Sequence, residues 1–465
     1  MDTIAAIAAG GGAPSAIGII RVSGPDCFNL CGRVFRAARP FGELEARRMV
    51  LGEMLDREGR CLDRGLAVRF PGPGSYTGED SAEFHCHGSS VVLREVLAAL
   101  FAAGARQAGP GEFTKRAFLN GRLDLTQAEA VVDLIDAETA AAARNAAAQL
   151  DGGLRRRLEP IQEALLDVTS RFYAVVDYPD EDIRDAGPEE TAAVLRGAEE
   201  ALTTLLASCK RGQVLKKGVR TAIVGLPNAG KSSLLNALAG YDRAIVTDVP
   251  GTTRDTVEES VLCGGVLLRL VDTAGLRETE DQVEKLGVER SRRAMEEAEL
   301  IFLVQDGAAE AENRAYLEAQ ARLLNQVAQT GKPWLCIESK LDLTGPHAFS
   351  LGLIQKDANN PAACLCVSSA TGQGLDRLGE AVAALFPAGD PGEAGSLLTD
   401  RRQEDAARRA LEAVRRAREA LEEGFTPDAV LTDAEEALDA LGELTGRTAR
   451  EEIVERIFSR FCVGK

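Results

Sequence analysis

The sequence predicts a multidomain α/β plus α fold. A P-loop domain with a doubly wound sheet is inserted into a split helical domain, and an α+β domain precedes both. Three observations predict this arrangement. A phosphate-binding motif, Gly225–Ser233, lies between a strand-like and a helix-like segment. Stretches rich in Ala, Leu, Glu and Arg with helical periodicity flank that region on both sides. The start of the chain carries Gly, Pro and short alternating apolar runs, which are typical of strands and turns.

Changes in composition along the chain predict four segments. The α+β domain occupies residues 1–120, the first helical part 121–217, the P-loop domain 218–385 and the second helical part 386–465. The two helical parts flank the P-loop domain, so the simplest architecture joins them into one helical domain.

Composition limits the class of protein. The 465 residues carry 54 basic and 72 acidic side chains, and the net charge of −18 argues against a protein that holds nucleic acid mainly by bulk electrostatics. Ten cysteines without CxxC pairs favour reduced thiols over a disulfide framework. No segment is long and apolar enough to span a bilayer. We therefore expect a cytoplasmic protein with no membrane span.

The P-loop motif has a specific chemical purpose at each position. Gly225 and Gly230 let the backbone curl so that N–H groups and a helix N-terminus point at phosphates. Lys231 reaches the outer phosphates, and the Ser232 hydroxyl can ligate magnesium. The nucleotide-binding residues predicted here are Asn228, Ala229, Gly230, Lys231, Ser232 and Ser233.

Two further motifs follow in the order that a nucleotide switch requires. Asp272 comes directly after a strand-like run, where its carboxylate can hold magnesium, and Gly275 would lie near the terminal phosphate. Thr252 and Thr253 lie between the P-loop and Asp272. A threonine there ligates the metal only while the terminal phosphate holds the loop, which makes this segment a switch, with Thr253 as the predicted magnesium ligand.

The motif Ser339-Lys-Leu-Asp342 predicts which base is bound. The Asp342 carboxylate can accept hydrogen bonds from both the ring N–H and the exocyclic amine of guanine, whereas adenine offers no such donor pair. We predict that Ser339, Lys340 and Asp342 contact GTP. The motifs together predict a Ras-like GTPase.

One part of the usual GTPase site is missing. Leu276 follows the Asp272 motif and cannot orient an attacking water as a glutamine would. Two residues are candidates to replace that glutamine. The Asn228 carbonyl could hold a monovalent cation against the phosphates, and Glu284 could position the water. An alternative reading of Glu284 is a solvated acid at a helix start.

Two segments outside the GTPase are too specific for a plain scaffold. Pro110–Glu129 is dense in charged and amide groups. The chain ends on Ile457–Lys465, which contains Cys462. A free thiol near cations can act as a nucleophile or an acid, and an inert thiol is the alternative.

These motifs closely resemble one known family. They are Gly225–Ser233, Ala244–Asp255, Asp272–Arg277, Tyr76–Asp80 and Phe458–Lys465. Together they resemble the tRNA modification GTPase family called MnmE or TrmE, over the whole chain. The Phe-Cys-x-Gly-Lys ending and the Pro110–Glu129 segment discriminate this family from other bacterial GTPases.

The resemblance implies an activity and partners. Members form homodimers through N-terminal domains that bind a tetrahydrofolate. With an FAD-containing partner, MnmG (GidA), in a heterotetramer, they act on the wobble uridine of certain tRNAs. They add an aminomethyl or carboxymethylaminomethyl group to C5. The one-carbon unit comes from 5,10-methylenetetrahydrofolate, of which 5-formyltetrahydrofolate is an analogue, and the nitrogen comes from glycine or ammonium. Potassium and dimerisation of the GTPase domains switch on hydrolysis.

The resemblance also implies site residues, which we carry over by position. They are Asn228, Thr247, Val249 and Thr252 for potassium; Glu284 for the attacking water; Ser368 and Ser369 for the guanine; Arg21, Glu79 and Arg122 for folate; and Cys462 and Lys465 for tRNA modification. The assigned catalytic residues are Glu284, Asn228 and Cys462. The assigned magnesium ligands are Ser232, Thr253 and Asp272.

Some positions depart from the family pattern. Ala8–Ser15 replaces a Thr-Pro-Pro-Gly-Arg-Gly-Gly-like loop, Arg122 replaces a lysine and Ser339 replaces an asparagine. The motif Ser368-Ser-Ala-Thr371 carries a serine where alanine is usual. Losing one amide hydrogen bond costs on the order of 1 kcal/mol, so Ser339→Asn is predicted to tighten GTP binding.

Other interpretations remain open. A regulatory or ribosome-assembly GTPase that binds RNA without altering it fits the GTPase motifs. A folate aminomethyltransferase acting on protein is the other alternative, but it would leave the GTPase motifs unexplained. His85 and His87 on one strand face could be two metal ligands, although a hydrogen-bonded strand edge is the plainer interpretation.

Overall fold

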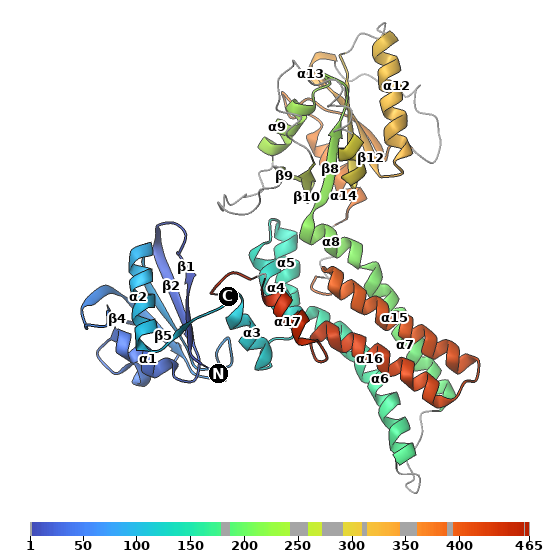
Figure 1. The fold of residues 1–465 in the computed structure, drawn as a ribbon. Helices are drawn as coiled ribbons and strands as arrows, with labels where there is room; N and C mark the ends of the chain where they lie inside the picture. The colour runs from blue at the N-terminus through green and yellow to red at the C-terminus, as the bar shows by residue number, and fades with distance from the viewer. Residues whose placement is uncertain are drawn as a thin grey trace. The chain divides into compact units, whose positions relative to one another are not determined.

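The computed structural model divides the chain into two compact units (Figure 1). The first comprises Met1–Val132, Gln149–Leu202 and Ala406–Lys465, and the second comprises Asp133–Ala148 and Thr203–Asp405. The structure describes residues 2–177, 187–241, 259–271, 292–308, 314–344, 360–387, 394–459 and 461–464. The predicted boundaries at 120, 217 and 385 stay predictions.

A seven-stranded sheet in the order β3-β4-β5-β6-β2-β1-β7 opens the first unit. Its strands are β1 Ile4–Ala9, β2 Ser15–Ser23, β3 Phe35–Arg36, β4 Val50–Leu55, β5 Cys61–Phe70, β6 Ser81–Gly88 and β7 Arg106–Gln107. The ladders from β3 to β1 are antiparallel, and β1 pairs with β7 in parallel. β1 and β2 are joined by a loop rich in glycine.

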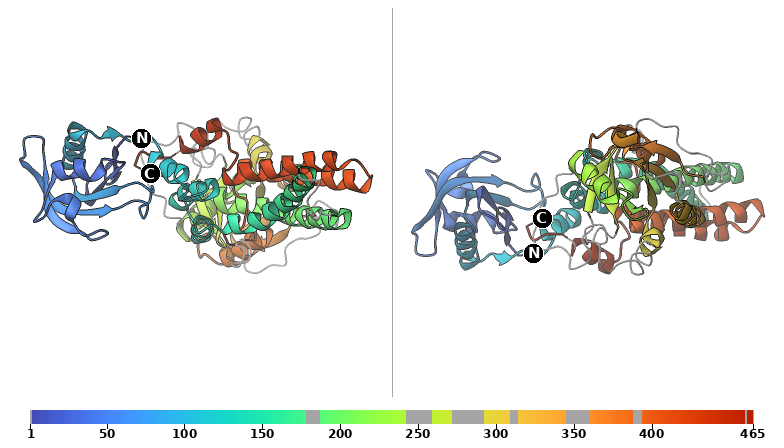
Figure 2. Two further views of the ribbon diagram at one scale, coloured as in Figure 1. Left: turned by 90° about the horizontal axis from the view of Figure 1, so that it is seen from below. Right: turned by 90° about the horizontal axis from the view of Figure 1, so that it is seen from above.

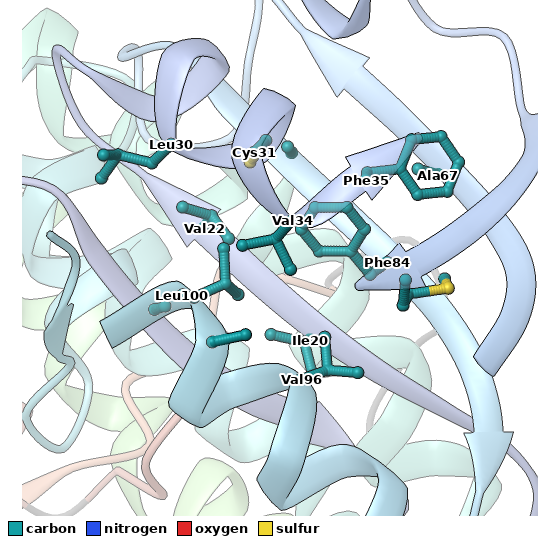
Figure 3. Close-up of a cluster of buried hydrophobic side chains, with 14 of the residues drawn as sticks. Ile20, Val22, Leu30, Cys31, Val34, Phe35, Ala67, Phe84, Val96 and Leu100 are labelled. Atoms are coloured by element: carbon teal, nitrogen blue, oxygen red, sulfur yellow. The ribbon is translucent and has the colours of Figure 1, made fainter. Parts of the chain in front are cut away.

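Alternation along β2 explains why this segment is a strand. Ile20 and Val22 are fully buried, whereas Arg21 between them points to the other face. The helices α1 Cys27–Val34 and α2 Ser90–Ala103 supply the other half of the core, where Val96 and Leu100 pack with Ile20 (Figure 3). Each such fully buried side chain contributes roughly 1.5–3 kcal/mol.

The second unit is built on a six-stranded sheet in the order β13-β12-β11-β8-β10-β9. Its strands are β8 Val219–Val224, β9 Glu259–Cys263, β10 Val266–Leu270, β11 Leu300–Asp306, β12 Trp334–Ser339 and β13 Ala363–Cys366. All neighbours run parallel except β9 and β10, which form a hairpin that turns at Gly264-Gly265.

The strands of this sheet read as nearly continuous apolar runs because separate buried clusters cover both of its faces. Its helices are α9 Lys231–Tyr241, α12 Arg314–Gln329, α13 Leu341–Thr344 and α14 Leu375–Leu385. From β8 the chain goes to β9 and β10 on one side of β8 and then crosses to β11 on the other side. The carboxyl end of β8 is therefore the switch point where α/β sheets bind ligands.

The remaining elements are helical, apart from the short 3-10 turn η1 Phe41–Glu43. They are α3 Glu112–Leu119, α4 Leu125–Ile135, α5 Ala140–Leu150, α6 Gly153–Asp177, α7 Pro188–Ala207, α8 Cys209–Lys217, α15 Arg401–Glu422, α16 Pro427–Thr445 and α17 Glu451–Phe458. Periodicity predicted most of these helices. No helix in the described ranges is both long and apolar enough to cross a membrane.

Segments far apart in the sequence pack together among the helices of the first unit. Arg418 of α15 pairs with Glu199 of α7 at 2.9 Å. The Tyr173 hydroxyl of α6 donates a hydrogen bond of 2.8 Å to Glu435 of α16. The helical segments on either side of the P-loop therefore share one layer, as the split helical domain requires.

A buried guanidinium organises the start of the chain. Arg116 of α3 is 5% exposed. Its Nη1 donates to the Asp2 carbonyl at 2.7 Å and lies 3.1 Å from Glu79 Oε2, while its Nη2 donates to Glu112 Oε1 at 3.0 Å and to Asp2 Oδ1 at 2.9 Å. Arg106 binds the same two carboxylates, Asp2 and Glu112, at 2.7 Å each. This network ties the amino terminus, the loop before β6 and α3 together.

We predict that Gly212→Ala destabilises the second unit. A Cβ at Gly212 of α8 would lie 2.1 Å from the Leu398 carbonyl oxygen, so the backbone has to move. We expect a loss of about 1–3 kcal/mol, because overpacking outweighs the higher helix propensity of alanine. Thermal unfolding followed by the fluorescence of Trp334, the one tryptophan of the chain, measures the change.

Gly240→Ala in α9 is the matched control in the same unit. A Cβ there meets nothing within 4 Å, so alanine should keep or raise the unfolding midpoint. Equal midpoints for the two variants would contradict the packing argument.

We also predict that the α3 region loses stability at acid pH. Burial alone raises the pKa of Glu112, but hydrogen bonds from Arg106, the Gly109 N–H and Arg116 outweigh it and lower the pKa to about 2. A depressed pKa contributes stability that is complete above the unfolded pKa near 4.5 and is lost as pH falls toward 2.

Hydrogen exchange of the α3 amides, corrected for intrinsic rates, measures this loss. Protection should fall between pH 4.5 and 2. Glu112→Gln, which cannot ionise, should reduce the pH dependence. Unchanged protection in the wild-type chain across this window would rule the linkage out.

Candidate functional site

The P-loop begins at the carboxyl end of β8, at the switch point of the sheet. A Cβ at Gly225 would lie 2.4 Å from the Val304 carbonyl oxygen, so only glycine fits there. Gly230 has a φ of +93°, which other residues rarely adopt. Asn228 is also left-handed, with a φ of 58°, and its side chain is exposed. A tight glycine-containing loop of this kind ahead of a helix start is the backbone that a phosphate cradle requires.

The first turn of α9 carries the predicted phosphate and magnesium groups. Lys231 Nζ donates to the carbonyl oxygens of Gly225 and Leu226 at 2.9 and 2.8 Å. Burial lowers the pKa of Lys231. Ser232 and Ser233 follow on the exposed side of the helix start, and Ala229 is buried beneath the loop. These residues suit a nucleotide phosphate chain and one hydroxyl ligand for magnesium.

The predicted guanine residues meet the P-loop from the neighbouring strand ends. Ser339 ends β12, is 3% exposed and donates a hydrogen bond of 2.7 Å to the Ala229 carbonyl. Ser339 therefore supports the P-loop itself, a contact that the motif alone did not reveal. The tighter GTP binding expected for Ser339→Asn stays a prediction. Titration calorimetry would measure the GTP affinity of the variant and the wild type.

Two side chains orient the rest of the guanine motif. The buried Ser368 hydroxyl donates to Asp342 Oδ1 at 2.6 Å, which leaves Oδ2 of that carboxylate for a ligand. Lys340, with a φ of 62°, donates to Asp306 Oδ2 at 2.6 Å. Ser369 follows Ser368 and is half-buried. Sequence reasoning missed Asp306, although its place at the end of β11 was a usable signal.

Several predicted residues lie outside the described part of the chain. They are Thr247, Val249, Thr252, Thr253, Asp272, Gly275, Glu284 and Lys465. The potassium set is therefore described only at Asn228 and the magnesium set only at Ser232.

The predicted folate residues gather around the loop Tyr76–Asp80 in the first unit. The Arg21 guanidinium lies 5.6 Å from the Tyr76 ring centroid and 5.7 Å from that of Phe113, and it pairs with Glu83 at 2.9 Å. This arrangement leaves a cation between two aromatic rings. Tyr76 and Phe113 were not predicted as site residues.

Glu79 and Arg122 adjoin the same loop. Glu79 accepts a hydrogen bond of 2.9 Å from the Ser23 hydroxyl in addition to its pairing with Arg116. A Cβ on Gly78 would lie 3.3 Å from Cγ of Arg122, whose side chain is exposed. The structure thus brings Arg21, Glu79 and Arg122 to one loop. Two arginines and a carboxylate suit a ligand with an acidic tail and ring N–H donors.

The C-terminal motif is anchored by aromatic packing. The ring centroids of Phe458 and Phe461 lie 5.3 Å apart with the rings tilted, and the ring of Phe118 of α3 lies 6.2 Å from that of Phe458. Phe458, Phe461 and Leu125 share one buried cluster. This packing holds the last residues of the chain against α3 and α4.

The tail then crosses to the first sheet and exposes its thiol. Val463 forms an antiparallel bridge with Pro110, and the Gly111 N–H donates to the Cys462 carbonyl at 3.3 Å. A Cβ on Gly464 would lie 2.4 Å from the Ile7 carbonyl oxygen. The end of the chain lies beside its start in every view (Figures 1 and 2), and Cys462 is exposed there.

The two histidines of β6 lie beside carboxylates. His87 Nδ1 lies 2.7 Å from Asp63 Oδ1, and His85 Nε2 lies 3.6 Å from Glu83 Oε2. Among the described residues, no group of three or more His, Cys, Asp or Glu side chains could hold a metal ion. β6 is an interior strand of the sheet, so the expected strand edge is wrong, although the hydrogen-bonded pairing of His87 is present.

Comparisons with known proteins agree with this arrangement. A family model described as the MnmE helical domain matches residues 125–462, and one described as the N-terminus of the GTP-binding protein TrmE matches residues 3–122. A GDP-bound GTP-binding protein of Sulfolobus solfataricus is 17% identical over 49% of this chain and 66% of its own, with a TM-score of 0.27, which is too low to carry an argument.

Full-length relatives are more informative. The chain is similar to proteins named tRNA modification GTPase MnmE: 42% identical to that of Roseiflexus sp., 43% to that of Symbiobacterium thermophilum and 44% to that of Thermus thermophilus. Each comparison covers 100% of this chain and 99% of the relative. The predicted fold class and the predicted resemblance are both confirmed. The chain therefore belongs to the MnmE (TrmE) family of tRNA modification GTPases.

Proposed function

We propose that this protein is a cytoplasmic, GTP-hydrolysing enzyme that modifies C5 of the wobble uridine of certain tRNAs. One observation carries the proposal: the exposed Cys462 is held on the N-terminal domain by the Pro110–Val463 bridge and the Gly111 hydrogen bond, in a chain that also contains a P-loop. A GTPase that only binds RNA needs no thiol at this position.

The N-terminal domain is proposed to hold the folate. Arg21, Glu79 and Arg122 would bind it, with Tyr76 and Phe113 as flat apolar surfaces beside the ring. When bound, 5,10-methylenetetrahydrofolate supplies the one-carbon unit. The role of Arg116 is to keep the Glu79 carboxylate in place. The exposed thiol of Cys462 would face the tRNA, and Lys465 would add a positive charge.

The GTPase domain is proposed to drive a conformational change. Lys231 and the P-loop amides would hold the phosphates, with Ser232, Thr253 and Asp272 on magnesium and Gly275 near the terminal phosphate. Asp342, oriented by Ser368, would select guanine beside Ser339, Lys340 and Ser369. Because Leu276 cannot orient water, Glu284 is assigned that task.

Potassium and dimerisation complete the proposed catalytic site. Asn228 would ligate the cation with Thr247, Val249 and Thr252, since the left-handed backbone at Asn228 exposes its side chain beside the phosphates. We propose a homodimer, and a heterotetramer with the FAD-containing MnmG partner. Glycine or ammonium supplies the nitrogen.

We predict that tRNA from cells lacking this protein has lost its C5-aminomethyl-type uridine. Mass spectrometry of nucleosides from bulk tRNA measures the change. Expression of the wild-type chain should restore the nucleoside, and Cys462→Ser should restore far less of it. An unchanged nucleoside profile on deletion would instead favour a regulatory GTPase that does not alter RNA.

We predict that GTP turnover is much faster in potassium than in sodium, because the smaller ion fits the proposed Asn228 site less well. Phosphate release at matched ionic strength measures turnover. Asn228→Ala should remove the difference between the two salts. Equal wild-type rates in both salts would eliminate the cation mechanism while leaving GTP binding intact.

A further inference from the structure

Three of the ten cysteines gather on β13, the edge strand of the second unit's sheet, and on its neighbour β12. The two strands run parallel, and their register sets Cys336 opposite Cys364 and Glu338 opposite Cys366. Residues in register on neighbouring strands share one face of a sheet, and so do residues two positions apart on one strand. These four side chains therefore form a square on one face. None of them belongs to the proposed nucleotide, folate or C-terminal sites.

The three thiols of this square differ in their surroundings. Cys336 is fully buried, and the half-buried Cys364 packs against the same apolar cluster. The Cys336 thiol donates a hydrogen bond to Cys364, which lowers the pKa of Cys364. Cys366 faces the Glu338 carboxylate instead, with its Sγ 3.5 Å from Oε2. Burial and that carboxylate raise the pKa of Cys366. Cys364 is therefore the thiol that ionises most readily, and a second thiol contacts it.

We propose that Cys364 and Cys336 are a modification site, at which a peroxide converts the two thiols into a reversible disulfide that loosens guanine-nucleotide binding. A partly exposed thiolate beside a second thiol is the arrangement of a redox-sensitive cysteine. Neighbouring strands lie about 4.7–4.9 Å apart, within the roughly 4.4–6.8 Å that a disulfide tolerates between Cα atoms. The two residues can thus be bridged while β12 and β13 stay paired.

Hydrogen peroxide supplies the oxidation. The Cys364 thiolate attacks one oxygen of the peroxide, the O–O bond breaks, and hydroxide leaves and takes up a proton. Cys364 is then a sulfenic acid. The Cys336 sulfur attacks the sulfenic sulfur, the S–S bond forms, the S–O bond breaks, and water leaves with the Cys336 proton. The two thiols lose two electrons in all, and one peroxide becomes two waters.

The disulfide acts on the guanine motif because β12 and β13 lead directly into it, so this step rests on the proposed guanine site. Ser339 ends β12, and Ser368, two residues beyond β13, donates to Asp342 Oδ1 at 2.6 Å. A disulfide favours a Cα separation of roughly 5.5–6 Å, which is wider than the strand spacing. Oxidation therefore pushes the strands apart and weakens the bond that orients Asp342. We expect GDP to bind about three- to tenfold more weakly.

Peptide mapping of the full-length chain under non-reducing conditions tests the modification site. After treatment with hydrogen peroxide, mass spectrometry should detect a cross-link between the peptides that carry Cys336 and Cys364. Cys27 and Cys31 of α1 are the internal control, because their sulfurs lie 4.0 Å apart but neither side chain is exposed. They should stay reduced. A missing Cys336–Cys364 cross-link, or one that forms no faster than a Cys27–Cys31 disulfide, would overturn the proposal.

Two variants identify the thiol that reacts. Cys364→Ser should abolish the cross-link to Cys336. Cys366→Ser changes the same strand two residues away, at a position that is also half-buried, and should keep the cross-link. A cross-link that survives Cys364→Ser, or that Cys366→Ser removes, would contradict the assignment.

Titration calorimetry with GDP tests the effect on the guanine site. The oxidised wild type should bind GDP about three- to tenfold more weakly than the reduced protein, and dithiothreitol should restore the affinity. Cys364→Ser treated with peroxide should bind GDP as the reduced wild type does. Equal GDP affinities for reduced and cross-linked wild type would refute the effect on binding. A reduced chain that binds no GDP would instead count against the proposed guanine site, which the peptide map does not depend on.

Discussion

The candidate site of the first unit depends on the buried guanidinium of Arg116. It binds the Asp2 backbone and the carboxylates of Glu79 and Glu112, groups that lie up to 114 positions away in the sequence. Removing one member of such a buried network typically costs about 3–5 kcal/mol, because the remaining charges are left unpaired. The geometry of the Tyr76–Asp80 loop therefore follows from α3, and α3 in turn carries the residues that receive the C-terminal tail.

The C-terminal tail packs against the same unit of the protein. Phe458 and Phe461 anchor it among apolar side chains, and the next residues reach Pro110 and the end of β1 through backbone contacts. The absence of a Cβ at Gly464 permits that close approach. Because backbone contacts fix the tail, the Cys462 side chain stays exposed for chemistry. In the second unit, Ser339 similarly uses one buried hydroxyl to tie the guanine strand to the P-loop.

Local patterns in the sequence predicted most of the fold, because P-loop spacing, alternation and helical periodicity each extend over a few residues. They did not reveal that α6 continues through Pro160, where tertiary packing offsets the missing N–H, or that α17 ends at Phe458. Contacts between residues far apart in the chain could not be predicted from a single sequence either. The pairing of Lys340 with Asp306 and the Arg116 network depend on how strands and helices meet in space.

Cys462 and the proposed folate residues belong to the same unit, and thiol protection tests most directly whether they form one site. The full-length chain is alkylated with iodoacetamide, with and without 5-formyltetrahydrofolate, and the rate at each cysteine is read by mass spectrometry. Cys61, which is also exposed but lies on β5, is the internal control. We predict that folate slows the alkylation of Cys462 and leaves the alkylation rate of Cys61 unchanged. Folate binding that leaves both rates unchanged would contradict it.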